Sequence, residues 1–410
     1  MIDTILDHQN DRDATLKLIS WFDIARVRAA KILVVGAGAI GNEVLKNLAL
    51  LGVGNIYIFD RDTIEMANLS RSVLFRAKDN GKPKALTAAA ALKELNPSVN
   101  VYWRQGEIEA DLGEGLIRQM DVVIGALDSV NARFWLNRLC WKAGRPWVDA
   151  AIGDLNGEVS VFVPPDGPCY ECDFTELHYR QTPLARPCGL LAAQALGEGK
   201  VPTTPMIASL VAAVQVQECM KLLDPGAWAG RSLAGRKFYF NGRVGYVEIM
   251  GLPRRGNCPA HVVRHADQRR ALTGMSAGHP AAALLAEAQA MLGPDAFLYL
   301  GSEIAIDRVC PCGNRISVLR PVRALDVEAL TCSDCQRPCH WESDIRMTHE
   351  IHSGSAPDLL GARLWDLGVP WFGVVEARAG GGEVLYLELT GDAGSAVAEF
   401  VEFKEAGTVA

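Results

Sequence analysis

Residues 31–60, KILVVGAGAIGNEVLKNLALLGVGNIYIFD, decide the fold of this chain. The apolar run ILVV (32–35) leads into a glycine turn, and the helical segment EVLKNLALL separates it from a second apolar run, IYIFD (56–60). Short apolar runs that alternate with helices indicate parallel βαβ units. We therefore expect a strand, a turn, a helix and a parallel strand in this order.

The same alternation continues toward residue 150. The expected helices and strands are KALTAAAALKEL, VNVYW, a further helix, DVVIG (121–125), FWLNRLCWKAG and PWVDA. This pattern predicts a Rossmann-like α/β fold with a mixed, mostly parallel sheet that helices cover on both faces. A hairpin-like run follows Ala150, and after the helix TPMIASLVAAVQVQECMKLL two strands, KFYFN and YVEIM, are expected to extend the sheet.

Length and composition narrow the class of protein. The 410 residues indicate two or three domains, and 49% hydrophobic with 22% charged residues is the balance of a soluble globular protein. A net charge of −7 disfavours nucleic-acid binding by phosphate neutralisation. The start, MIDTILDHQNDRD, is acidic where a signal peptide is basic, and no stretch approaches the roughly 18 apolar residues of a membrane span. We expect a cytoplasmic protein without membrane or nucleic-acid partners, whose 11 cysteines are metal ligands, nucleophiles or core residues rather than disulfides.

A nucleotide site is predicted at the glycine turn. Gly36, Gly38 and Gly41 form a loop between strand and helix, where glycines allow backbone N–H groups to approach phosphate. Asp60 ends the second strand, where a carboxylate accepts hydrogen bonds from ribose hydroxyls. A nicotinamide enzyme would show the same pattern.

The segments after Asp60 favour a triphosphate over a hydride carrier. Asn68 and Arg71 lie in NLSR, and Lys84 lies in GKPK, so that an amide and two cations follow the loop. A triphosphate needs such cations. Asp128, after the strand DVVIG, is a candidate ligand for Mg²⁺ beside those phosphates.

These motifs resemble those of the ubiquitin-activating-enzyme (ThiF-type) adenylyltransferase superfamily. GAGAIG, FDRD, NLSR, GKPKA and ALDSVNAR occur in the family's order over roughly residues 10 to 262. The resemblance implies that ATP is bound by Gly36, Gly38, Gly41, Asp60, Asn68, Arg71, Lys84 and Asp128. It departs in the arm, where family members often carry Arg-Tyr-x-Arg, whereas here Arg12 is followed by Asp13 and Thr15, and Arg12 or Lys17 is the candidate replacement.

The expected organisation has four parts. Residues 1–29 form an N-terminal helical arm, in which Leu16, Ile19 and Phe22 recur at helical spacing and pack on the domain that comes after the arm. Residues 30–262 form the adenylation domain, with a long crossover loop at 173–204. Residues 263–290 form a connector, and 291–410 form a C-terminal cysteine-rich module.

Seven cysteines and one histidine are the candidate zinc ligands, and an eighth cysteine is the candidate nucleophile. Cys169-Tyr-Glu-Cys172 and Cys258-Pro-Ala-His261 supply two ligand pairs each, and the resemblance implies a structural zinc there. In the C-terminal module, Cys310, Cys312, Cys332 and Cys335 have nearly zinc-ribbon spacing, with Cys339 or His340 as alternatives. Cys140 and Cys219 lie at core positions of predicted helices.

Cys188 stands apart from these pairs, alone in the crossover loop before Pro202-Thr203-Thr204. In family members that pass their substrate onward, a cysteine in this region attacks the adenylate to form a thioester. A thiol suits this role because its thiolate is nucleophilic and a thioester stays reactive enough for a second transfer. An incidental loop cysteine is the alternative.

The leading hypothesis is an activating enzyme that uses ATP and Mg²⁺ to adenylate the C-terminal glycine of a ubiquitin-like protein, forms a thioester on Cys188 and transfers it to a conjugating enzyme. The C-terminal module would recruit that enzyme. The resemblance implies a homodimer, and likeness to bacterial ubiquitin-like conjugation operons implies a setting in antiviral defence. The alternatives are a sulfur-carrier-protein adenylyltransferase without a thioester, a nicotinamide-dependent oxidoreductase and a catalytically silent scaffold.

Overall fold

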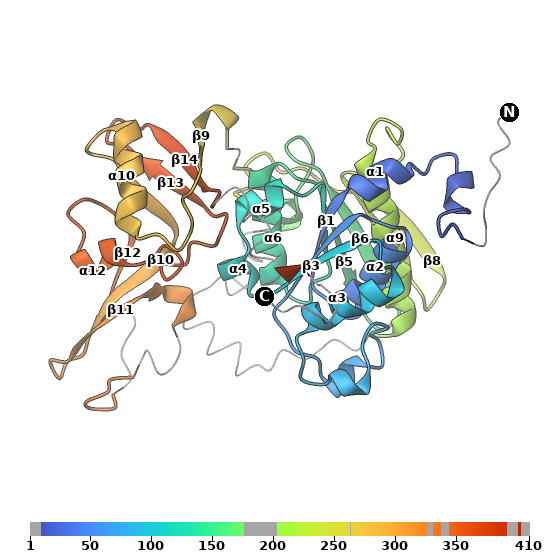
Figure 1. Ribbon diagram of the computed structural model, residues 1–410, viewed down its shortest axis with the longest axis horizontal. Helices are drawn as coiled ribbons and strands as arrows, with labels where there is room; N and C mark the ends of the chain where they lie inside the picture. Colours follow the sequence, from blue (N-terminus) through green and yellow to red (C-terminus); the bar gives the residue numbers. More distant parts are fainter. Residues whose placement is uncertain are drawn as a thin grey trace.

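The computed structural model describes residues 10–175, 203–262, 264–325, 331–337, 344–391 and 401–402. Within them a nine-stranded main sheet has the order β15-β3-β2-β1-β4-β5-β6-β7-β8 (Figure 1). The strands are β1 (Lys31–Val35), β2 (Asn55–Asp60), β3 (Asn100–Gln105), β4 (Val122–Gly125), β5 (Trp147–Ile152), β6 (Asn156–Phe162), β7 (Arg236–Asn241), β8 (Tyr246–Gly251) and β15 (Val401–Glu402).

The main sheet is mixed, and its parallel part is smaller than the sequence predicts. Strands β3, β2, β1, β4 and β5 are parallel, whereas β6, β7 and β8 follow as antiparallel neighbours and β15 pairs antiparallel with β3. Four of the pairings between neighbouring strands are therefore parallel and four antiparallel. The reason is that β5 is joined to β6 directly and β7 to β8 by a short turn, without the crossover that parallel pairing requires.

Helices cover both faces of the parallel part, as predicted (Figure 1). One face carries α1 (Ile24–Ala29), α2 (Ala39–Leu50), α3 (Lys84–Leu95) and α9 (Pro205–Leu223), and the other carries α4 (Ile108–Asp111), α5 (Glu114–Arg118) and α6 (Val130–Ala143). Alternation along β1 explains this, because Ile32 and Val34 join the first hydrophobic core while Leu33 and Val35 join the second. Among the described helices, α9 alone is long and apolar enough to cross a membrane, and half of its apolar window is buried in the protein.

The N-terminal arm packs on the main domain but is helical only in short pieces. It contains a 3₁₀ turn, η1 (Leu16–Leu18), and α1, whose N-cap Asp23 accepts a hydrogen bond from the Arg26 N–H. Leu16, Ile19 and Phe22 contact the first core as expected. Phe22 lies in the non-helical stretch between the two pieces, so the helical spacing of the three residues does not come from one continuous helix.

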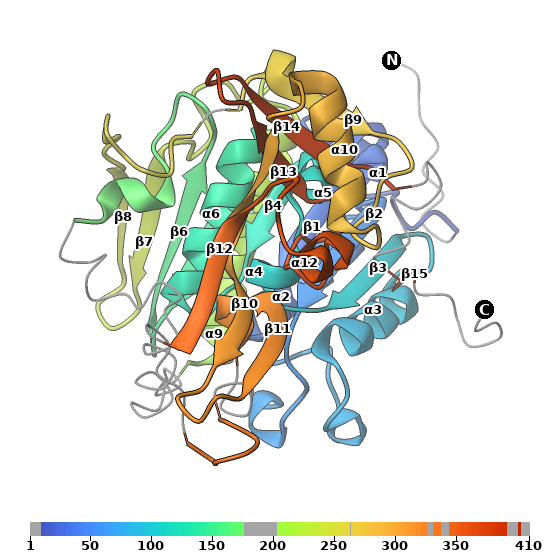
Figure 2. The same ribbon diagram turned by 90° about the vertical axis from the view of Figure 1, so that its left-hand side faces the viewer.

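The C-terminal module is built on a second sheet with the order β11-β10-β13-β14-β9, with β12 also paired to β10 (Figure 2). Its elements are β9 (Arg269–Leu272), α10 (Ala281–Leu292), β10 (Phe297–Val309), β11 (Arg315–Pro321), β12 (Ile345–Ile351), α12 (Pro357–Gly361), β13 (Val374–Arg378) and β14 (Val384–Leu389). The segment 263–290, expected to be a connector, supplies β9 and most of α10. These residues pack into the module's own hydrophobic core.

The two modules are joined by buried contacts on the α5–α6 face. The Gly115 N–H donates to the Phe372 carbonyl at 2.9 Å, and Arg118 Nη1 lies 2.7 Å from Glu388 Oε2. Arg264 pairs with buried Glu114.

The remaining short elements are the 3₁₀ turns η2 (Met66–Asn68), η3 (Ala77–Asp79), η4 (Tyr170–Asp173), η5 (Ala266–Gln268) and η6 (Val322–Ala324).

Candidate functional site

The glycine loop between β1 and α2 is shaped for close backbone approach. Gly36 has φ of +99°, and a Cβ there would lie 2.3 Å from the Ala126 carbonyl oxygen. A Cβ on Gly41 would lie 2.0 Å from the Gly36 carbonyl oxygen. Gly38, the N-cap of α2, has open space where its Cβ would be. The loop therefore excludes side chains on its protein side and leaves room at the helix N-terminus, where phosphate binds in nucleotide folds.

Asn42, which was not among the residues predicted for the site, fixes this loop. Its side-chain amide is fully buried and donates to the Ala37 carbonyl at 2.7 Å and to the Gly38 carbonyl at 3.0 Å. Its Oδ1 accepts from the Leu74 N–H at 2.9 Å. Asn42 thus ties the glycine loop to the segment that follows Arg71. Its only sequence signal is a polar residue at a buried helical position.

Asp60 lies beside the loop at the end of β2. Its Oδ2 accepts from the Ala37 N–H at 2.6 Å, and its Oδ1 accepts from the Asp62 N–H at 2.7 Å. Burial raises the pKa of Asp60, while the positive charge of Lys84 and the two N–H donors act in the opposite direction. Each carboxylate oxygen has a second lone pair, so the side chain retains acceptor capacity for a ribose hydroxyl.

The two predicted phosphate cations both belong to the segment between β2 and α3, Arg71 in its middle and Lys84 at its end. Lys84 is the first residue of α3, is nearly buried, and places Nζ 2.7 Å from Asp62 Oδ2. Arg71 is half-buried, and its Nη1 donates to the Ala67 carbonyl at 2.9 Å. Asn68 is buried and accepts from the Glu65 N–H at 2.9 Å, which closes the 3₁₀ turn η2.

Asp128 is exposed after β4, directly before Ser129, the N-cap of α6. Its charge contributes to the raised pKa of Arg61: burial opposes this shift, but Glu107, Asp62 and Asp128 together outweigh burial. In the strand order 3-2-1-4-5, strands are added on one side of β1 up to β3 and on its other side from β4 onward, so that the topological switch point lies between β1 and β4. Ligands of doubly wound sheets bind at the carboxyl edge of such a switch point, and the glycine loop, Asp60 and Asp128 all lie at that edge.

A buried ion pair supports the segment that carries Asp128. Arg133 Nε lies 3.1 Å from both carboxylate oxygens of Asp149, and Arg133 Nη2 donates to the carbonyls of Leu127 at 2.6 Å and Ala150 at 2.9 Å. Burial raises the pKa of Asp149 to about 6 although Arg133 opposes the shift. The sequence gives no sign of this pair, because the two residues are 16 positions apart and become neighbours only in the fold.

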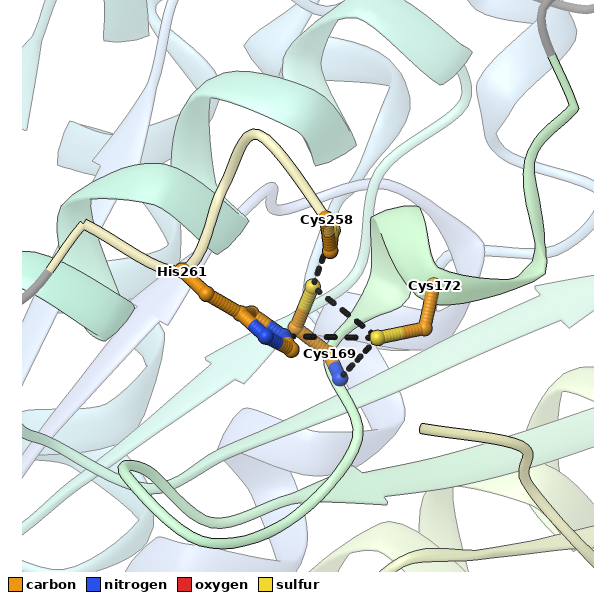
Figure 3. A group of neighbouring side chains, drawn as sticks. All are labelled: Cys169, Cys172, Cys258 and His261. Carbon is orange, nitrogen blue, oxygen red and sulfur yellow. Dashed lines mark hydrogen bonds between the residues drawn. The ribbon is translucent and has the colours of Figure 1, made fainter. Parts of the chain in front are cut away.

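The first predicted metal group comes together. Figure 3 shows the side chains of Cys169, Cys172, Cys258 and His261 drawn close to one another. Cys169 Sγ lies 3.6 Å from Cys258 Sγ and 3.8 Å from Cys172 Sγ, and Cys172 Sγ lies 3.3 Å from His261 Nε2. Ligands about 2.3 Å from a tetrahedral zinc ion are about 3.8 Å apart, so the sulfur spacing fits a metal and is far too long for a disulfide. The four residues could hold a metal ion.

This group is attached to α6, the helix that begins beside Asp128. Glu171, between the two cysteines, is fully buried and accepts from Arg138 Nε and Nη2 at 2.8 Å each. Asn137 accepts from the Tyr170 N–H at 3.0 Å. The His261 ring stacks on Trp141 at 4.1 Å. Both ends of α6 are therefore fixed, one by the ion pair of Arg133 and the other by the cysteine knuckle.

The second group lies where β10 turns into β11. Cys310 Sγ lies 3.6 Å from Cys335 Sγ, and Cys312 Sγ lies 3.7 Å from Cys332 Sγ. Cys312 and Cys335 are exposed, whereas Cys310 and Cys332 are buried. These four residues could also hold a metal ion. The alternatives Cys339 and His340 lie outside the described residues.

The remaining cysteines divide into core and loop. Cys140 and Cys219 are fully buried in the two cores, as predicted for packing residues, and burial raises the pKa of both thiols. Cys188 and Pro202, with nearly all of the predicted crossover loop, lie outside the described residues. At its end, Thr204 is the N-cap of α9, and its hydroxyl donates to the Asp154 carbonyl at 3.1 Å.

The arm does not bring its basic residues to the glycine loop of the same chain. Arg12 Nη1 donates at 3.0 Å to the carbonyl of Leu95, at the end of α3 opposite to Lys84. Lys17 pairs with Asp11.

Comparisons with known proteins agree on one family. The model of the ThiF family matches residues 10–260. The SAMP-activating enzyme E1 of Haloferax volcanii is 33% identical over 235 residues, which cover 57% of this chain and 81% of that protein. The sulfur carrier protein adenylyltransferase of Thermus thermophilus is 32% identical over 241 residues, which cover 57% of this chain and 83% of that protein.

Solved structures agree on the fold. The crystal structure of E. coli MccB with MccA-N7isoASN matches with a TM-score of 0.52 and 22% identity, covering 62% of this chain and 76% of that one. At this identity the likeness supports the fold alone.

Proposed function

The chain belongs to the ThiF family of ATP-dependent adenylyltransferases, and from that premise we propose that it activates a ubiquitin-like protein by adenylating its C-terminal glycine. The observation that carries this proposal is the carboxyl edge of the parallel strands. There the open N-terminus of α2 at Gly38 lies on the same edge as Asp60, and Lys84 is held by Asp62.

The residues have separate roles in this proposal. Gly36, Gly38 and Gly41 admit the nucleotide, Asp60 accepts from the ribose, and Asn68, Arg71 and Lys84 contact phosphates. Asp128 would hold Mg²⁺, which supplies positive charge to the phosphates when it is bound. The exposure of Asp128 beside the N-terminus of α6 supports this assignment.

The chemistry needs positioning and charge rather than a base. A carboxylate oxygen of the modifier attacks the α-phosphorus of ATP, the bond from that phosphorus to the bridging oxygen breaks, and pyrophosphate leaves with the electron pair. The carboxylate is already ionised at neutral pH, so no proton moves. Lys84 and Arg71 stabilise the charge on the departing pyrophosphate, which is the role expected of fixed cations.

Exchange of labelled pyrophosphate into ATP tests this proposal, with β-grasp proteins of the same genome that end in Gly-Gly as substrates. We expect exchange that depends on one such protein and falls by roughly 100-fold in Lys84→Ala. Lys82→Ala is the matched control, because Lys82 pairs with Asp79 at 2.9 Å and is half-exposed. Exchange without any modifier, or equal exchange in both variants, would overturn the assignment.

We further propose that Cys188 carries the activated modifier. Its thiolate attacks the acyl carbonyl of the adenylate, AMP leaves, and a thioester forms that a conjugating enzyme then accepts. The expected sign is an ATP-dependent adduct that reductant removes. Cys188→Ala should lose the adduct and keep pyrophosphate exchange, and Cys188→Ser should give an adduct that resists reductant. An adduct that persists in Cys188→Ala refutes this role.

A sulfur-carrier adenylyltransferase is the second candidate, because the Thermus thermophilus relative with that name is matched over 83% of its length. This function predicts modifier-dependent exchange without an adduct on Cys188. The same adduct assay therefore separates the two candidates.

The two cysteine groups are proposed to bind structural zinc. The first fits a Cys₃His site closed to solvent, since its three cysteines are buried, and the second fits a Cys₄ site. Neither group lies at the carboxyl edge of the parallel strands, which supports a structural rather than a catalytic role.

Self-association is also proposed, because β8 is an edge strand with exposed Val247 and Ile249, and sedimentation of the full chain tests it.

A further inference from the structure

Asp62 lies between the residue proposed for the ribose and the lysine proposed for the phosphates. Its backbone N–H donates to Asp60 Oδ1 at 2.7 Å, and its backbone carbonyl accepts from the Lys84 N–H at 3.0 Å. Its side chain makes a third contact, because Lys84 Nζ lies 2.7 Å from Asp62 Oδ2. A β-bridge between Thr63 and Pro83 joins the same two segments. The backbone therefore fixes the place of Asp62, and its carboxylate acts on the Lys84 ammonium.

The Lys84 ammonium needs a carboxylate at this position. Lys84 is the first residue of α3, where the partial positive charge of the helix N-terminus is unfavourable for a cation. Its side chain is only 11% exposed, so water solvates little of its charge. Of the residues that the structure describes, Asp62 alone forms an ion pair with Lys84. The carboxylate of Asp62 therefore compensates the charge of the ammonium and holds it in one place.

The ion pair leaves Lys84 able to bind phosphate. An ammonium group has three N–H donors, and the contact with Asp62 uses one of them. The Asp62 side chain is 44% exposed, so the pair is accessible to a ligand from solvent. Arg61 Nε lies 3.5 Å from the other carboxylate oxygen of Asp62, but Arg61 Nη1 also lies 3.5 Å from Glu107 Oε2. Arg61 therefore has a second carboxylate partner and does not depend on Asp62 alone.

We propose that Asp62 is a positioning residue for adenylation, whose carboxylate orients the Lys84 ammonium so that its two other N–H donors meet the triphosphate of MgATP. The inference rests on the proposed adenylation and adds to it a residue that does not itself touch the nucleotide. Because the effect passes through Lys84, it concerns the phosphates and not the nucleoside. A carboxylate that merely stood near the phosphates would have the opposite effect, since removal of its negative charge would strengthen MgATP binding.

The test uses the full chain, and a substitution at Asp62 leaves both of its backbone contacts in place. Asp62→Ala removes the carboxylate, and Asp62→Asn keeps an oxygen acceptor without the charge. Glu107→Ala is the matched control, because Glu107 is a similarly exposed carboxylate that pairs with Arg61 and not with Lys84. Asp62→Ala and Glu107→Ala are also each combined with Lys84→Ala. The readouts are the Kd for MgATP by calorimetry and the Kd for adenosine, which has no phosphate, by ligand-observed NMR.

We expect Asp62→Ala to raise the Kd for MgATP roughly tenfold, the range of a lost charge-assisted hydrogen bond, and to leave the Kd for adenosine within about twofold of the wild type. Asp62→Asn should lose less affinity for MgATP, because its amide oxygen still accepts from the ammonium. Glu107→Ala should lie within about twofold of the wild type for both ligands, as expected of an exposed ion pair. In the Lys84→Ala background, Asp62→Ala should cause no further loss, since no ammonium is left to orient.

Several results would overturn the inference. An unchanged or lowered Kd for MgATP in Asp62→Ala would show that its carboxylate does not orient Lys84. An equal loss for adenosine would show that it acts on the ribose side through Asp60, and a further loss of roughly tenfold in the Lys84→Ala background would show that it acts without Lys84. Should Asp62→Ala lower the melting temperature, Asp62→Asn is compared with Glu107→Ala for the same two ligands, and an equal loss for both ligands is again the contrary result.

Failure of the proposed function looks different. If the wild type binds no MgATP, the proposed adenylation itself fails. If the wild type and Lys84→Ala bind MgATP equally well, the phosphate role of Lys84 fails, and the role of Asp62 fails with it. If Lys84→Ala loses affinity while Asp62→Ala does not, only the positioning role of Asp62 fails.

Discussion

Replacing Arg133 by methionine tests how the main domain supports the carboxyl edge of the parallel strands, where the nucleotide is proposed to bind. The substitution keeps the length and apolar volume of the side chain but leaves the buried Asp149 carboxylate without its cation. It also removes donors from the carbonyls of Leu127 and Ala150, at 2.6 and 2.9 Å. The loss should therefore appear both in stability and in the placement of Asp128, which follows Leu127.

The magnitude follows from the burial of the pair. Breaking a buried ion pair by removing one partner costs about 3–5 kcal/mol, which for a domain of this size corresponds to a fall in Tm of roughly 6–20 °C. Removing both charges with Arg133→Met and Asp149→Leu should recover at least half of the loss, because no charge then remains buried.

The pH dependence has a defined sign. The folded pKa of Asp149, about 6, lies above its ordinary value of 3.8, so the carboxyl contributes most to stability below pH 4 and this contribution is lost as the pH rises through 6. Without Arg133 the folded pKa rises further, and the loss extends to higher pH. The difference in unfolding free energy between wild type and Arg133→Met should therefore be small at pH 5 and largest at pH 8.

Urea unfolding followed by circular dichroism at both pH values measures these quantities. A single variant within about 1 kcal/mol of the wild type at pH 8 would contradict the reasoning. A double variant as unstable as the single one would do so as well, since it would show that the loss comes from packing and not from the unpaired charge.

Three other substitutions or pairs give separate outcomes. Gly38→Ala should leave the melting temperature unchanged and weaken MgATP binding about tenfold, because its methyl group meets no protein atom but enters the space proposed for phosphate. Gly41→Ala should instead lower the free energy of unfolding by about 1–3 kcal/mol, because its methyl group would lie 2.0 Å from a backbone carbonyl oxygen. Thermal melting and calorimetry of both variants compare these two effects. Cys258→Ser and Cys332→Ser should each remove one zinc ion per chain by elemental analysis, and unchanged zinc content in either would refute that site. Arg118→Met breaks the 2.7 Å contact between the modules and should expose the junction to limited proteolysis, with an unaltered cleavage pattern as the contrary result.

Much of the local structure could be predicted from the sequence. The helix predicted for KALTAAAALKEL coincides with α3, because Pro83 precedes it and alanine and leucine dominate it. The order of the glycine loop, Asp60 and Asp128 also predicted their common edge, since each directly ends or follows a strand of the parallel part. The three strands that lead to these residues, β1, β2 and β4, contain unbroken apolar runs, and such runs are buried on both faces.

Other features carry no local signal. The strand β9 lies in the segment predicted to be a connector, because RRAL has no apolar alternation and becomes a strand only through parallel pairing with β14. The partners of the buried polar residues Asn42, Arg133 and Glu171 cannot be predicted from the sequence. Their burial is stabilised by partners 16 to 33 residues away or by carbonyls of the glycine loop.

By itself, the sequence determined the glycine loop, the order of strands and helices along the chain, and the two groups of four ligands that could each hold one metal ion. These depend on spacing along the chain, which fixes the local backbone geometry. Only the tertiary structure decided that the C-terminal module is docked on α5 and α6, where Arg118 meets Glu388 and the Gly115 N–H donates to the Phe372 carbonyl. The strength of electrostatic attraction depends on distance in space and on burial, and neither can be predicted from the spacing of residues along the chain.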